Sequence, residues 1–142
     1  MEASKRAGRE TLVRFPATIS GMATAADVIR AFLDGVEVSP ARRYQLELTF
    51  DEIVSNIVRH GQPVSSVELV ITLEDAEALM TFDDDGVAFD PRAFQNVPQR
   101  APIERAQAGG FGLILVRKCA SRIEYERTPQ HHNRLTVAIP LR

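Results

Sequence analysis

Three polar residues in the middle of the chain are spaced four apart: Glu52, Asn56 and His60. On an α-helix each such step turns by only about 40°, so the three side chains form one polar line. A carboxylate and an amide one turn apart can hold a divalent cation and activate a water or a hydroxyl. Segments 84–86 (Asp-Asp-Gly) and 109–112 (Gly-Gly-Phe-Gly) let the backbone approach a bound group closely. Together these features indicate an ATP site that uses no Walker lysine, because the chain has no Gly-Lys-Ser/Thr loop.

Each of these residues also has an ordinary structural explanation. Glu52 is either a general base or a solvated helix glutamate, and Asn56 is either a Mg²⁺ ligand or a helix-surface asparagine. Arg59 and His60 end the helix, where cations suit the helix dipole as well as they suit nucleotide phosphates. Asp84 either accepts a hydrogen bond from the adenine amine or belongs to an acidic turn. The order and spacing of the whole set favour the functional interpretation.

The hydrophobic periodicity predicts the elements that must position these residues. Ser39 and Pro40 are typical of a helix start, and Gly61 is typical of a helix end, so one helix should carry the polar line. Its apolar residues repeat on the opposite face and predict burial against a core. The predicted strands are 11–15, 67–73, 78–83, 123–127 and 135–141, and the predicted helices are 23–34, 40–60 and 113–120.

One segment lacks any such periodicity. Residues 91–108 contain three prolines and predict a long loop, which in a compact domain is often a functional lid. The polar residues 1–10 predict a disordered lead, and residues 11–142 predict a single domain.

Composition narrows the class of protein further. The net charge is −2 and the isoelectric point about 5.9, which argues against nucleic acid as a direct partner. Cys119 is the only cysteine, so an intrachain disulfide is excluded. No apolar run approaches the roughly 20 residues of a membrane helix, and residues 1–9 show no signal-peptide core. These features predict a cytoplasmic protein without membrane contact.

The polar line, the Asp-x-Gly segment after a strand, the proline-rich loop and the Gly-Gly-x-Gly-Leu segment occur in a recognisable order. This order resembles the N box and the two glycine boxes of the GHKL ATPase superfamily, which includes DNA gyrase and histidine kinases. Phe89-Asp90-Pro91 and Asn133-Arg134-Leu135-Thr136 make the chain most similar to its small branch, the anti-sigma factors that are also serine-protein kinases. The resemblance covers about residues 10–142.

The resemblance implies an α+β fold, the two-layer Bergerat sandwich. A mixed, mostly antiparallel sheet of about five strands would carry about three helices on one face. Glu52 would be the catalytic base, Asn56 would ligate Mg²⁺, and Asp84 would bind the adenine amine, helped by Thr136 and a water. The further ATP contacts that it implies are Arg59, His60, Gly86, Phe89, Arg105, Gly109, Gly110, Gly112 and Leu113.

The same resemblance implies partners and leaves alternatives. The chain would phosphorylate a STAS-domain anti-anti-sigma protein on serine, sequester a sigma factor and form a homodimer. One alternative is a protein-binding regulator, gated by ATP or independent of it, without kinase activity. Another is the ATPase domain of a histidine kinase. We see no His-containing helix pair ahead of Ser39, which argues against this second alternative.

Overall fold

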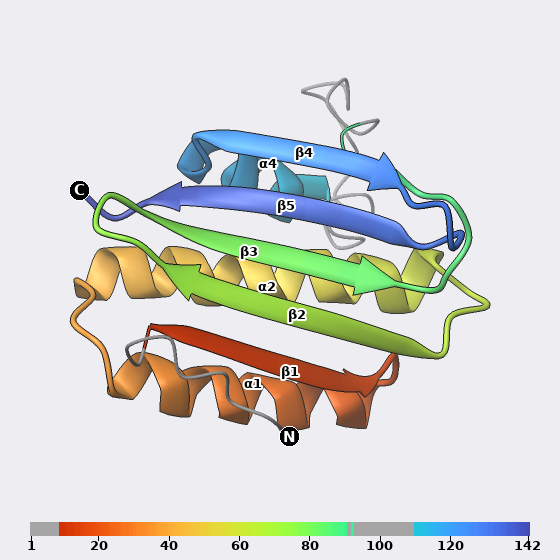
Figure 1. The fold of residues 1–142 in the computed structure, drawn as a ribbon, viewed down its shortest axis with the longest axis horizontal. Helices are drawn as coiled ribbons and strands as arrows, with labels where there is room; N and C mark the ends of the chain where they lie inside the picture. Colours follow the sequence, from red (N-terminus) through yellow and green to blue (C-terminus); the bar gives the residue numbers. More distant parts are fainter. Residues whose placement is uncertain (1–8, 91, 93–109) are drawn as a thin grey trace.

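The computed structural model describes residues 9–90, 92 and 110–142, and the account below concerns these residues. Five strands form one sheet, and three helices accompany it (Figure 1). The elements are β1 (Glu10–Pro16), α1 (Ile19–Asp34), α2 (Pro40–His60), β2 (Ser66–Leu73), β3 (Glu77–Asp84), α4 (Gly110–Cys119), β4 (Arg122–Arg127) and β5 (Asn133–Pro140).

The sheet has the strand order β1-β2-β3-β5-β4, so β5 inserts between β3 and β4. Every pairing between the described strands is antiparallel. The sheet implied by the resemblance allowed a parallel pair as well, and the described strands contain none. The α+β class with a five-stranded sheet and three helices, predicted from the sequence, is confirmed.

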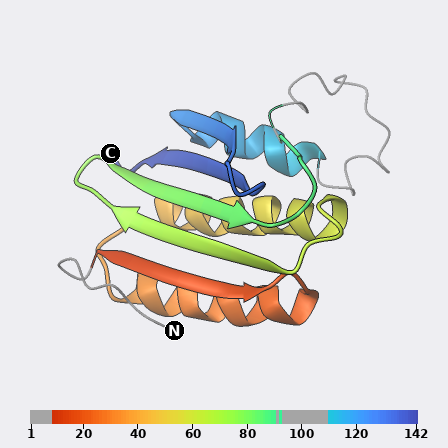
Figure 2. The ribbon, with the colours of Figure 1, turned by 45° about the vertical axis from the view of Figure 1, so that its right-hand side comes forward.

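The helices lie on one face of the sheet, which leaves the other face uncovered by the described chain (Figure 2). In β2 and β3 buried and half-buried residues alternate strictly, as expected when one face packs on a core. The core lies between that face and the helices. Its largest fully buried side chains include Phe50, Phe82, Leu46 and Leu69. We call the other side the open face of the sheet.

Local signals explain where the helices begin and end. α2 starts after Ser39, whose hydroxyl accepts from the Arg42 amide at 3.2 Å, and stops at Gly61, as predicted. α1 starts at Ile19, four residues before the predicted position, because Thr18 caps it by accepting from the Gly21 amide at 3.0 Å. The first turn of α1 begins with Ile19, which is 82% exposed, and contains the poor helix former Gly21, so the apolar repeat of the helix did not mark it.

Parts of two predictions lie outside the described residues. Residues 1–8 of the expected lead are among these, while Glu10 already belongs to β1. Of the expected lid at 91–108, only Arg92 is described. None of the helices in the described ranges is long and apolar enough to cross a membrane.

Gly21 lies where the start of α1 closely approaches the end of β1. A Cβ atom added there would lie 2.1 Å from the Pro16 carbonyl oxygen, a backbone atom that cannot rotate away. We therefore expect Gly21→Ala to lower the free energy of unfolding by about 1–3 kcal/mol, although alanine favours a helix over glycine. Urea denaturation measures the change. Gly35→Ala is the matched control, because its Cβ would only touch the Phe32 carbonyl at 3.6 Å. Equal stability of both variants would contradict the prediction.

Candidate functional site

A pocket opens between the C-terminal half of α2 and the ends of β3, β4 and β5. Its floor is apolar and its buried polar groups come from three separate elements: Asn56 of α2, Asp84 of β3 and Asn133 of β5. Such a set of convergent polar groups in an apolar hollow is typical of a small-molecule site. Ile53, Asn56, Ile57, Gly61, Phe82, Asp84, Phe89, Tyr125, Asn133 and Leu135 line it.

Glu52 and Asn56 each leave a buried polar atom without a partner. Glu52 Oε2 and Asn56 Nδ2 find no hydrogen bond among the described residues. Buried polar atoms are almost always paired, so two orphans one helical turn apart indicate a ligand or solvent position. Burial also raises the pKa of the Glu52 carboxyl, opposed by the Arg59 cation and assisted by Asp51.

Asp84 is the buried carboxylate of the pocket, with 5% of its surface exposed. Its Oδ1 accepts from the Gly86 amide at 2.9 Å and from Asn133 Nδ2 at 3.0 Å. Among the described residues Oδ2 receives no hydrogen bond, so it is free to accept one from a ligand amine. Burial raises the pKa of Asp84 above its usual range, although the bonds from Asn133 and Gly86 act in the opposite direction.

Asn133 connects Asp84 to the walls of the pocket. Besides its bond to Asp84, its Nδ2 donates to the Val87 carbonyl at 2.8 Å. Its Oδ1 accepts from the Phe89 amide at 3.1 Å, from the Tyr125 hydroxyl at 2.5 Å and from Arg127 at 3.2 Å. One buried amide therefore fixes the loop after β3 against both C-terminal strands.

Gly86 is required by a close approach of two backbones. A Cβ at this position would lie 2.4 Å from the Gly61 carbonyl oxygen, which itself accepts from the Val87 amide at 3.1 Å. The loop after β3 is thus pressed against the end of α2. This close approach explains the Asp-x-Gly spacing, because any side chain at position 86 would push Asp84 away from the helix that carries Glu52 and Asn56.

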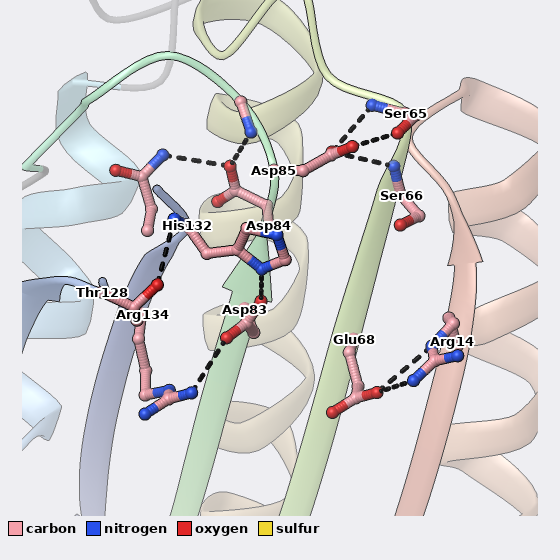
Figure 3. A network of polar contacts seen from close by, with 12 residues as sticks. Arg14, Ser65, Ser66, Glu68, Asp83, Asp84, Asp85, Thr128, His132 and Arg134 are labelled. Carbon is pink, nitrogen blue, oxygen red and sulfur yellow. Dashed lines mark hydrogen bonds and ion pairs between the residues drawn. The ribbon is translucent and has the colours of Figure 1, made fainter. Parts of the chain in front are cut away.

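Three consecutive aspartates point in three directions (Figure 3). Asp83 lies on the open face, where its carboxylate forms hydrogen bonds with His132 Nδ1 at 2.6 Å and with the Arg134 guanidinium at 3.3 Å. Asp84 enters the pocket, and Asp85 holds the segment before β2. The amides of Ser65 and Ser66 and the Ser65 hydroxyl donate to Asp85. The Ser65 hydroxyl, above all, keeps the pKa of Asp85 below its usual range.

Two further predicted contacts lie together at the rim of the pocket. The His60 and Phe89 rings are stacked, with centroids 5.9 Å apart and planes at 12°. Arg59, the preceding residue, is exposed at the end of α2. The structure therefore groups Asn56, His60, Asp84, Gly86 and Phe89 around one pocket, with Glu52 one turn before Asn56.

Thr136 does not join this group. Leu135 and Val137 point into the core, so Thr136 between them lies on the open face, in register with Thr81. Thr136 was expected beside Asp84, but the alternation of side chains along β5 puts it on the opposite face. Asn133 lies beside Asp84 instead. Counting by twos from the apolar Leu135 and Val137 would have assigned Asn133 to the pocket side.

The second glycine segment is only partly described. Gly110 and Gly112 lie in the first turn of α4, a position where free amides suit a phosphate. Leu113 is buried in the core rather than in the pocket. Arg105 and Gly109 lie outside the described residues.

The family of the chain follows from comparison with known proteins. A family model described as a histidine kinase-like ATPase domain matches residues 15–139. Because this match spans most of the chain, the protein belongs to the family of histidine kinase-like ATPase domains. The resemblance to the GHKL ATPases that the sequence motifs indicated is confirmed.

Two particular proteins are similar to the chain. It is 33% identical over 89 residues to serine/threonine-protein kinase BtrW of Bordetella bronchiseptica, which is 60% of this chain and 62% of BtrW. The chain thus spans less than two thirds of the length of this relative. It also resembles a chain of the SiaB–SiaC complex from Pseudomonas aeruginosa, with a TM-score of 0.66 and 16% identity over 90% of this chain and 88% of that one. This second likeness shows the fold alone.

The raised pKa of Glu52 predicts a pH-dependent gain of stability in Glu52→Gln. Above the usual carboxyl pKa of about 4.3, ionised Glu52 is disfavoured in the folded state, and this cost grows as the pH rises through the folded pKa. The variant should therefore be more stable than wild type at pH 7 and equally stable below about pH 4. Urea denaturation at both values tests this. Glu126→Gln, which removes an exposed carboxylate that pairs with Arg134, should show no such gain; a gain there or at low pH would refute the explanation.

The contacts of Asn133 predict its role in ligand binding. Asn133→Ala should remove the hydrogen bonds from Asn133 Nδ2 to Asp84 and to the Val87 carbonyl, and weaken adenine-nucleotide binding on the order of tenfold or more. Thr136→Val should leave binding unchanged, because Thr136 lies on the open face. Titration with a fluorescent ATP analogue compares the two, with circular dichroism to verify folding. Weaker binding by Thr136→Val than by Asn133→Ala would reverse the assignment.

Proposed function

We propose that the chain is an ATP-dependent serine-protein kinase that regulates a partner-switching pair of proteins. One observation carries the proposal: Glu52 and Asn56 hold unpaired buried polar atoms one turn apart, beside the pocket that ends at Asp84. A structural role gives no reason to leave both atoms unpaired, whereas a phosphoryl-transfer site requires free groups there.

The residues present fit a magnesium nucleotide. Asn56 Oδ1 is a hard oxygen ligand of the kind Mg²⁺ prefers, and Asn56 Nδ2 needs an acceptor such as a phosphate oxygen. When bound, the ion would neutralise charge on the phosphates. At the other end of the pocket Asp84 Oδ2 would accept from the adenine amine, with His60 and Phe89 at the rim and Arg59 beside them. The amides of Gly110 and Gly112, together with Gly109 and Arg105, are proposed for the phosphates.

Glu52 would act on the protein substrate. A general base must be able to receive a proton at neutral pH, and burial raises the pKa of Glu52 in that direction. The Arg59 cation acts on this pKa in the opposite direction and favours the ionised form, which is the form that accepts a proton. In the proposed reaction Glu52 accepts the proton of the serine hydroxyl. The serine oxygen attacks the γ-phosphorus of ATP, and ADP leaves.

The partners are proposed from the resemblance to the anti-sigma kinases, and the names of two similar proteins are consistent with it. BtrW is a serine/threonine-protein kinase by name, and the SiaB-type neighbour was solved in complex with SiaC. We propose that this chain phosphorylates a STAS-domain anti-anti-sigma protein, sequesters a sigma factor, acts in the cytoplasm and forms a homodimer.

Calorimetric titration with a non-hydrolysable ATP analogue, with and without Mg²⁺, tests the nucleotide site. We expect Mg²⁺-dependent binding that Asp84→Asn weakens on the order of tenfold or more, since it replaces the acceptor Oδ2. Asp83→Asn is the matched control, because the adjacent carboxylate lies on the open face and should not affect binding. Wild-type protein that fails to bind at millimolar analogue would refute the ATP site.

Phosphotransfer from ATP to each purified STAS-domain protein of the source organism tests the kinase. Glu52→Gln should keep analogue binding and lose phosphorylation by roughly 10²-fold or more, the usual contribution of a general base. Phosphoserine is detected by mass spectrometry. Full phosphorylation by Glu52→Gln would contradict the role of Glu52. Sigma-factor binding with no phosphorylated protein would favour a regulator that only binds.

A further inference from the structure

Three neighbouring strands each place one polar side chain in a row at the same end of the sheet. Asp84 of β3 lies directly opposite Asn133 of β5, and Asn133 lies directly opposite Arg127 of β4. Directly opposed residues of an antiparallel sheet point to the same face. Since Asp84 and Asn133 line the pocket, Arg127 stands on the pocket side of β4, next to Asn133 and one strand further from Asp84.

Arg127 binds the two residues that hold Asp84. The Gly86 amide and Asn133 Nδ2 both donate to Asp84 Oδ1, at 2.9 Å and 3.0 Å. Arg127 Nη1 donates to the oxygen of each of these residues, to the Gly86 carbonyl at 2.8 Å and to Asn133 Oδ1 at 3.2 Å. One guanidinium nitrogen therefore supports both of the donors that fix the carboxylate.

The side-chain amide of Asn133 uses all of its hydrogen-bonding capacity. Its Oδ1 accepts three hydrogen bonds, one of them from Arg127. Both hydrogens of its Nδ2 are used as well, one on Asp84 and the other on the Val87 carbonyl. A flipped amide would set donor against donor and acceptor against acceptor. Arg127 thus favours the orientation in which the amide nitrogen faces Asp84 Oδ1, and this leaves Oδ2 for a ligand.

The contacts of Arg127 are those of a supporting residue. Arg127 is not among the described residues that line the pocket. Within the described part of the chain it forms no ion pair, whereas Arg122 at the other end of β4 pairs with Glu77 and Glu124. Its hydrogen bonds go to two neutral oxygens. Its contribution is therefore the position of the groups that it binds, and not the neutralisation of a charge.

We propose that Arg127 is a positioning residue for the nucleotide base, which holds the two donors of Asp84 so that Oδ2 faces the amine of adenine. The inference rests on the adenine contact in the proposed function. Hypoxanthine carries a carbonyl oxygen where adenine carries this amine. A site built to bond a donor rejects the analogue that lacks it. Arg127 therefore sets the preference for adenine over hypoxanthine, although it touches neither base.

Calorimetric titration with ADP and with IDP, both with Mg²⁺, tests this role. The two ligands share the sugar and the phosphates, so the ratio of their Kd values reports the base contact. Wild type should bind ADP more tightly than IDP, on the order of tenfold or more. Arg127→Met keeps an unbranched side chain and removes the donor. It should weaken ADP binding roughly tenfold, the value of one well-placed hydrogen bond, and leave the Kd of IDP within about twofold.

Three further variants show whether the effect passes through Asp84. Arg122→Met makes the same substitution on the same strand, next to the core residue Ile123 and hence on the open face, and should change neither Kd. Arg127→Lys should recover part of the preference, because both hydrogen bonds come from one nitrogen and an ammonium group can make both. In the Asp84→Asn protein, Arg127→Met should have little further effect on ADP binding, because the two residues act as a unit.

Two results for Arg127→Met would overturn the inference. Equal weakening of ADP and IDP would indicate a phosphate contact or a loss of structure, and ADP binding equal to that of wild type would show that Asp84 needs no such support. A full additional loss in the Asp84→Asn protein would also contradict it. Failure of the proposed nucleotide site gives a different result, since wild type would then bind neither nucleotide or would bind both equally.

Discussion

Asp84 and Asn133 end the ladder between β3 and β5 as directly opposed residues, joined by a hydrogen bond of 3.0 Å. A carboxylate buried in an apolar hollow is costly unless it is paired, and this bond and the Gly86 amide supply the pairing. The same asparagine holds the loop that closes the pocket. A shift of one residue in this pairing would move Asp84 to the open face and break every one of these contacts.

Helix α2 meets two different demands on its two sides. Its apolar side chains, such as Phe50 and Val54, fill the core and fix the helix against the sheet. The polar line from Glu52 to His60 adds no comparable packing to the core, and two of its buried atoms have no hydrogen-bond partner among the described residues. Packing on one side therefore compensates for a site on the other, which is the usual relation between a rigid scaffold and unsatisfied functional groups.

The sequence predicted the elements and most of the pocket because strong local signals mark them. Ser39, Pro40 and Gly61 bracket α2, and the alternating strands bracket the Asp-x-Gly segment. Local alternation along β5 assigns the face of Asn133 but not its partner. Its role was missed because that role depends on which strand lies beside β5, and non-local pairing leaves no mark in local periodicity. Thr136 was placed beside Asp84 because its face of the strand was not considered. The flanking apolar residues Leu135 and Val137 would have assigned it to the opposite face.

Tyr125 and Arg127, which hold Asn133 and the Gly86 carbonyl, stand on β4. This strand is one of the two edge strands of the sheet and pairs only with β5. Edge strands open by local unfolding at a smaller free-energy cost than central ones, and amide hydrogen exchange reports such openings. The pocket wall can therefore loosen while the core between α2 and the central strands stays folded. A ligand held in this pocket would then be released by the fraying of one six-residue strand, without unfolding of the whole domain.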